Sequence, residues 1–118
     1  MLPKAHRLTN SEEFRRTVRS GQRSVTPTVV VHGAFDGGDV PARFGVTVSK
    51  SVGGSVVRHR VARQIRHGIL GKLADVPSGS RWVIRALPAA GALRSGEVSS
   101  PGTDVQAGIE LALLGAGR

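Results

Sequence analysis

The segment between residues 42 and 74 constrains the fold more than any other, because it has no acidic residue and repeats an apolar pattern. Valine or isoleucine recurs every fourth residue, which predicts a helix over about residues 56–73 with one buried face. These apolar positions are Val57, Val61, Ile65 and Ile69. The opposite face carries a series of basic side chains, namely His59, Arg60, Arg63, Arg66 and His67. The segment therefore predicts a helix that is apolar inward and cationic outward.

A solvated helix face usually mixes acids with bases, so a face without acids indicates an anionic partner. The whole chain supports this, since 17 Lys plus Arg against 8 Asp plus Glu give a formal charge of +9. Nucleic acid or an anionic membrane surface are the partners that such a charge favours. Gly53 and Gly54 predict a tight turn that brings Lys50 and Arg58 to the positive helix end, which could hold a phosphate.

The remaining elements predict an α+β chain with the order αββαβα, forming one domain over residues 1–118. Asn10 predicts the cap of a short first helix with Glu13 as its capping-box partner, ending near Gly21. Strands are predicted around residues 27–33 and 42–50, as a hairpin, and around 80–88. The composition predicts a mobile loop at about residues 89–103. A closing helix would then start with a capping box between its first residues, Thr103 and Gln106.

No constellation of residues predicts catalysis by side chains. The chain has no cysteine, and its acids fall in predicted caps, turns or near the chain ends, so no carboxylate pair converges. No acid is placed to orient His59 as a base, and eight residues separate His59 from His67, too many for one metal ion. We therefore expect no catalytic residue, no metal ligand and no organic cofactor. No signal peptide or apolar run of spanning length is present, which predicts a cytoplasmic protein without a membrane partner.

A second group of residues admits two interpretations. Phe14 and Val18 share a helix face, and Val30 and His32 alternate onto one face of a strand. These four side chains either belong to the core or line a groove in which nucleic-acid bases stack.

The segment GVTVSKSVGGSVVRHRVARQIRH, residues 45–67, resembles the signature of the bacterial ribonuclease P protein subunit. That signature is a strand, a basic lysine, a glycine turn and an Arg-Asn-Arg helix with further basic residues. The resemblance extends to LPKAHRLTNSEEFRRTVRSG, TVVVH and WVIRALPAA, and so covers most of the chain.

The resemblance implies an α/β sandwich, like the second domain of a ribosomal protein, with a left-handed βαβ crossover. It implies that an RNA subunit with bound Mg²⁺ hydrolyses precursor tRNA while the protein assists. The implied contacts with the RNA subunit are Lys50, Arg58, His59, Arg60, Arg63 and Arg66. The implied cleft for the 5′ leader of precursor tRNA is lined by Phe14, Val18, Val30 and His32.

Three departures from the family pattern bear on function. His59 stands where the signature has Asn, and Ala62 and Gln64 stand where the family often has basic or apolar residues. Val18 and His32 occupy positions that are frequently aromatic, which predicts weaker stacking on the leader. The alternative function is that of a structural RNA-binding protein, ribosomal or chaperone-like, which would use the same helix without stimulating cleavage.

Overall fold

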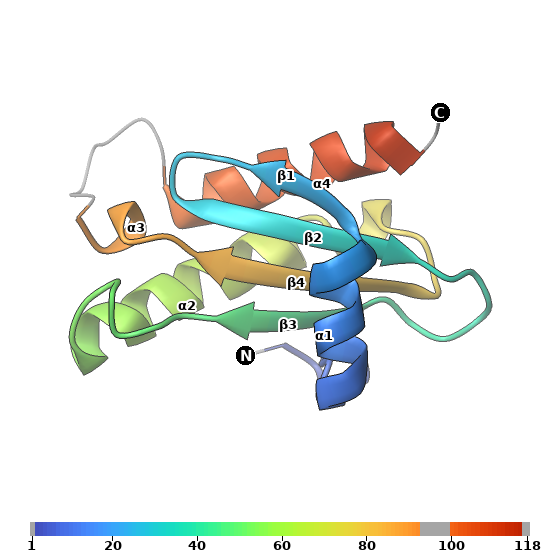
Figure 1. The fold of residues 1–118 in the computed structure, drawn as a ribbon, viewed down its shortest axis with the longest axis horizontal. Coiled ribbons are helices and arrows are strands. Elements are labelled where there is room, and N and C mark those ends of the chain that lie inside the picture. Colours follow the sequence, from blue (N-terminus) through green and yellow to red (C-terminus); the bar gives the residue numbers. More distant parts are fainter. Residues whose placement is uncertain (1, 93–99, 117–118) are drawn as a thin grey trace.

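The computed structural model describes residues 2–92 and 100–116, and it consists of one four-stranded sheet with helices on both faces (Figure 1). Helix α1 crosses one face, and α2 and α4 cover the other. The strands are β1 (Gln22–Val25), β2 (Val29–Phe35), β3 (Arg43–Thr47) and β4 (Ser80–Ala86). The α-helices are α1 (Ser11–Ser20), α2 (Ser55–Leu70), α3 (Ala89–Ala92) and α4 (Pro101–Ala116), and the 3-10 helices are η1 (Lys4–His6) and η2 (Leu73–Asp75).

The sheet confirms the α+β class and corrects the predicted strand pairing. The strand order is β1-β2-β4-β3, in which β4 pairs antiparallel with β2 and parallel with β3. The predicted hairpin of β2 with β3 is therefore wrong, because β4 lies between them. Figure 1 shows that the path from β3 through α2, behind the sheet, to β4 is left-handed, as the family resemblance implied.

Strand β1 is the strand that the sequence prediction missed, so the order of α-helices and strands begins αβββαβ. Its sequence, QRSV, is short and has no apolar alternation, and only Ser24 is buried. β1 is held in an extended conformation by β2, with which it forms an antiparallel hairpin. The signal for β1 is thus the neighbouring apolar strand rather than its own residues.

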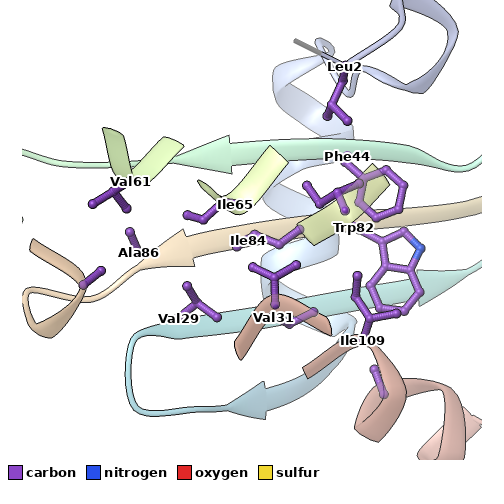
Figure 2. Close-up of a cluster of buried hydrophobic side chains, with 14 of the residues drawn as sticks. Leu2, Val29, Val31, Phe44, Val61, Ile65, Trp82, Ile84, Ala86 and Ile109 are labelled. Carbon is purple, nitrogen blue, oxygen red and sulfur yellow. The ribbon is translucent and has the colours of Figure 1, made fainter. Parts of the chain in front are cut away.

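The core lies between the sheet and the pair α2 and α4 (Figure 2). Alternate residues of β2 and β4, among them Val31 and Ile84, point to this side and meet Ile65 of α2 and Ile109 of α4. Trp82 is fully buried with its ring edge-on to Phe35 at 5.4 Å and stacked on Phe44 at 6.0 Å. The three aromatic rings thus fill one end of an otherwise aliphatic core.

An ion-pair network fixes α1 to the opposite face of the sheet. Glu13 accepts two hydrogen bonds from Arg43, at 2.8 and 2.7 Å. Arg81 lies 3.9 Å from Glu13 and 3.1 Å from Asp36. The bonds from Arg43 lower the pKa of Glu13 below its usual value, against the opposing effect of desolvation. Asn10 caps the helix as predicted, but the Glu13 side chain binds Arg43 instead of completing a capping box.

The N-terminal segment runs along the outer edge of β3. The backbone N–H of Leu8 donates to the carbonyl of Phe44 at 2.9 Å, and Nδ1 of His6 lies 2.7 Å from the carbonyl of Ala42. Leu8 itself is buried. The segment therefore supplies hydrogen bonds where β3 has no strand neighbour.

Helix α4 begins earlier than predicted. Ser100 accepts the backbone N–H of Thr103, and Gln106 donates to the carbonyl of Gly68, so the predicted box between Thr103 and Gln106 does not form. Asp104 accepts hydrogen bonds from the backbone and side chain of Thr28 and ties α4 to the start of β2. The predicted loop at 89–103 contains α3 and the start of α4, and its residues 93–99 lie outside the described residues.

Over residues 2–92 and 100–116, none of the helices combines the length and the apolar character that crossing a membrane requires.

We predict that Glu13→Gln lowers the free energy of unfolding by about 1–2 kcal/mol, because two charge-assisted hydrogen bonds to Arg43 are weakened. Since the pKa of Glu13 is lowered in the folded protein, the wild type should lose this advantage as the pH falls below the unfolded value near 4.5. Urea unfolding at several pH values measures both effects.

Glu12→Gln is the matched control, because Glu12 pairs with Arg15 on the open surface. Its effect should stay within about 0.5 kcal/mol. Equal losses in the two variants would contradict the anchoring role of Glu13.

Candidate nucleic-acid interface

The turn before α2 depends on one glycine of the predicted pair. Gly53 has φ of +156°, and a Cβ there would lie 2.8 Å from Cγ1 of Val57. Gly54 has an ordinary extended conformation and open space around its Cα, and it occupies the N-cap position. The N–H of Gly53 donates to the carbonyl of Lys50, which closes the turn and holds that lysine just before the helix. The tight turn is confirmed, and its requirement for glycine rests on Gly53.

Helix α2 has the two faces that its sequence predicts. Three residues of the apolar stripe, Val61, Ile65 and Ile69, have no exposed surface, and Val57 is half-buried against the core. Burying these side chains fixes the rotation of the helix, so the arginines between them must face outward.

Five basic residues of α2 line two hollows, which share Ser55, His59 and Arg66. One hollow, of about 300 Å³ beside β3, has Arg58, His59 and Arg66 in its lining. The other hollow, of about 660 Å³, has basic residues at four of the six positions in its lining: His59, Arg60, Arg63 and Arg66. The structure therefore brings together five of the six residues predicted to bind the RNA subunit. Lys50, the sixth, is exposed in the turn.

Carboxylates of residues 2–92 and 100–116 do not neutralise this face. The ion pairs among the described residues involve Arg15, Arg43, Lys72 and Arg81, and none involves a basic residue of α2. Arg60 donates one hydrogen bond to the carbonyl of Gly91 at 3.3 Å, and Arg63 is exposed. Such a concentration of cations without counter-charges is the electrostatic signature of a polyanion-binding surface.

The sheet face that carries α1 is arranged in rows of residues paired across the strands. The row at Arg43 and Arg81 lies under α1 and contains the ion-pair network. The next row runs Arg23, His32, Val83 and Gly45, and the last row runs Val25, Val30, Arg85 and Thr47. In that last row Val25, Arg85 and Thr47 are all exposed, so this part of the sheet stays accessible beside α1.

The four predicted cleft residues share this face but differ in exposure. Phe14 is half-buried with its ring over Gly45, where a Cβ would lie 2.7 Å from the ring. Val18 is 39% exposed, whereas Val30 and His32 are only 5% and 6% exposed. Phe14 thus packs as part of the fold and still borders the accessible surface. Val18 offers the most surface of the four.

Sequence reasoning missed two basic residues on this face, Arg23 and Arg85. Arg23 lies directly opposite His32, and Arg85 lies opposite Val30, diagonal to His32. Arg23 was missed because β1 was not recognised. The alternation of Arg81, Val83 and Arg85 in β4 did contain the signal for Arg85.

The described residues offer no group of three His, Asp or Glu side chains able to hold a metal ion. Among the described acids, Glu13 pairs with Arg43, Asp36 pairs with Arg81, and the buried Asp104 accepts hydrogen bonds from Thr28. The arrangement can therefore bind and orient an anionic polymer.

Comparison with known proteins places the chain in a family. A family model described as Ribonuclease P matches residues 2–103. The chain belongs to the ribonuclease P protein family. The ribonuclease P protein component of Corynebacterium diphtheriae is 45% identical over 116 residues, which cover 93% of this chain and 95% of that protein. The component from Streptomyces griseus is 39% identical over the full length of both chains.

Solved structures of ribonuclease P proteins have the same fold. The protein from Staphylococcus aureus superposes with a TM-score of 0.72 at 23% identity, over 96% of each chain. The protein from Thermotoga maritima gives 0.69 at 20% identity, over 91% of this chain and 94% of its own. The resemblance noted from the sequence is thereby confirmed for both family and fold.

We predict that Gly53→Ala destabilises the protein by about 1–3 kcal/mol, because alanine is strained at this φ and its Cβ would contact Val57. Gly54→Ser is the matched control, since serine is a favoured N-cap and meets no neighbour there. Thermal unfolding measures both. A stable Gly53→Ala protein would contradict the proposed geometry of the turn.

Proposed function

We propose that this chain is the RNA-binding protein subunit of ribonuclease P, which assists a catalytic RNA in removing the 5′ leader from precursor tRNA. The observation that carries the proposal is the row of unneutralised cations on α2 in a chain of this family. The subunit would act in the cytoplasm, where it would meet both RNAs.

The α2 face is the proposed contact with the RNA subunit. Guanidinium groups bind phosphate through paired donors, and a face that neutralises about five phosphates lowers the repulsion between two RNAs. In this proposal the protein contributes to the rate by positioning the two RNAs, and the RNA subunit carries out the hydrolysis.

The accessible sheet face beside α1 is the proposed contact with the leader. Phe14 and Val18 offer apolar surface next to it, and the exposed arginines of β1 and β4 offer positive charge. Single-stranded RNA needs this combination of a cationic track and an apolar platform.

Mg²⁺ would belong to the RNA subunit in this proposal. A cationic surface repels a divalent ion, and the acids of the described chain do not converge on a binding site. The protein would reduce the Mg²⁺ concentration needed for docking by supplying fixed positive charge of its own.

Reconstituted cleavage tests this function. Purified protein alone should cut nothing, and with a bacterial ribonuclease P RNA it should lower the Mg²⁺ needed for cleavage of precursor tRNA. Arg63→Glu should weaken binding to the RNA subunit by about tenfold or more and reduce the log-log salt slope, expected near −3.5 to −4.5 for wild type, by about 1. The melting temperature should not change, because Arg63 is exposed.

Lys4→Glu is the charge-matched control, because Lys4 is exposed in η1, away from the hollows of α2. RNA binding without stimulated cleavage would favour the alternative of a structural RNA-binding protein. Equal effects of Arg63→Glu and Lys4→Glu on binding to the RNA subunit would contradict the assignment of the α2 face as the contact with that subunit.

We predict that Val18→Phe strengthens binding of precursor tRNA relative to mature tRNA by about five- to a hundredfold, because a ring at this exposed position can stack on a leader base at about 1–3 kcal/mol. Val40→Phe is the control, since Val40 is also exposed but lies in the connection between β2 and β3. Binding titrations with both tRNAs measure the ratio. An unchanged ratio in Val18→Phe would place the leader elsewhere.

A further inference from the structure

Three nitrogen-rich side chains come together on the accessible sheet face from three adjacent strands. His32 lies in the middle, on β2. Arg23 on β1 is its direct cross-strand partner, and Arg85 on β4 is its diagonal neighbour beyond Val83. Side chains in these relations lie within contact range of one another, since directly opposed Cβ atoms are about 5 Å apart and diagonal ones about 7 Å apart.

Within the described residues, the cluster lacks a hydrogen-bond partner for His32 and a counter-charge for its two arginines. Nδ1 of His32 is buried and has no hydrogen-bond partner among the described residues. Both arginines are exposed and neither takes part in an ion pair found in the described chain. A buried polar atom without a partner costs free energy, and so do adjacent cations without a counter-charge. One added anion would supply the counter-charge that the two arginines lack.

We propose that Arg23, His32 and Arg85 together bind one phosphate of the RNA leader, and that this binding takes up a proton on His32. The inference rests on the proposed function and specifies how the leader face recognises its ligand. Recognition of the leader would then depend on its backbone more than on base stacking, which compensates for the missing aromatic side chains at Val18 and His32.

The surroundings favour a phosphodiester of a single strand. Guanidinium groups on both sides of the ring can each donate paired hydrogen bonds to phosphate oxygens. Val25, which is 59% exposed and follows Arg23 on the same face, adds apolar surface for a sugar or base. Helix α1 covers the sheet on the other side of the cluster, at the row of Arg43 and Arg81, and so limits how broad the ligand can be.

The direction of the proton linkage follows from the charges that face the ring. Desolvation lowers the pKa of His32 in the protein without ligand, and Arg23 from β1 and Arg85 from β4 lower it further. No carboxylate is among the groups that shift the pKa of His32. Glu13, the acid of α1 that contacts the sheet, is bound to Arg43. A bound phosphate reverses the local charge and raises the pKa. Affinity should therefore increase as the pH falls through the bound-state pKa and level off below the lower pKa of the unliganded protein.

The first test compares binding of precursor and mature tRNA to the reconstituted holoenzyme between pH 5.5 and 8. For the wild type, the precursor-to-mature affinity ratio should rise as the pH falls, by at most tenfold per pH unit for one proton. His32→Asn keeps a polar side chain that does not titrate, and its ratio should be independent of pH. A wild-type ratio independent of pH, or a dependence that survives in a folded His32→Asn protein, would overturn the proton linkage.

The second test asks whether a phosphate is the group recognised. Arg23→Gln and Arg85→Gln should each reduce the ratio by about tenfold, while Lys4→Gln, which loses the same charge in η1, should not. Replacing leader linkages by neutral methylphosphonates should produce a similar loss with the wild-type protein, and this measurement does not depend on how any variant folds. Unchanged binding of the methylphosphonate leader would overturn the phosphate site.

The third test observes the ring itself. NMR titration of the imidazole of His32 should show a higher pKa when a five-nucleotide single-stranded RNA is added, and an unchanged or lower pKa would contradict the proposal. If these tests fail while the holoenzyme still needs less Mg²⁺ than the RNA alone, the proposed function stands without this site.

Discussion

The packing of α2 against the sheet is the interaction on which the rest of the structure depends. Three side chains of α2 that lose all contact with water determine how the helix is rotated, and β3 and β4 can lie parallel only because this helix connects them. The same burial makes the arginine positions face outward. The apolar pattern thus determines both the core and the direction in which the cationic surface faces.

The few acids of the chain distinguish structural cations from those available to a partner. Glu13 and Asp36 neutralise Arg43 and Arg81 beneath and beside α1, where Arg81 is buried and Arg43 is partly buried. The arginines of α2 and of the outer rows of the sheet have no such partner in the described chain. Both faces of the molecule therefore carry positive charge that is held in place by the fold but not compensated by it. In the proposed function, these two surfaces would bind two RNA segments at once.

How much could be predicted from the sequence depended on the range over which each signal acts. Local and periodic signals succeeded: the Asn10 cap, the turn at Gly53 and both faces of α2 follow from residues a few positions apart. Pairings between distant segments failed. Nothing local shows that β4 separates β2 from β3, or that Glu13 binds a residue thirty positions away. The basic residues show the same division, because those of α2 follow from the helix pattern whereas Arg23 depended on an unrecognised strand.

The N-terminal segment along β3 has a consequence for how copies of the protein meet. Its hydrogen bond from Leu8 to Phe44 occupies a backbone group that another extended chain would otherwise use. On this side the sheet is closed to growth by strand addition, even at the high local concentrations at which basic proteins accumulate on RNA. A chain that lacked these first residues would expose the backbone edge of β3 to other strands, and crowding on the nucleic acid would then favour aggregation over specific complexes.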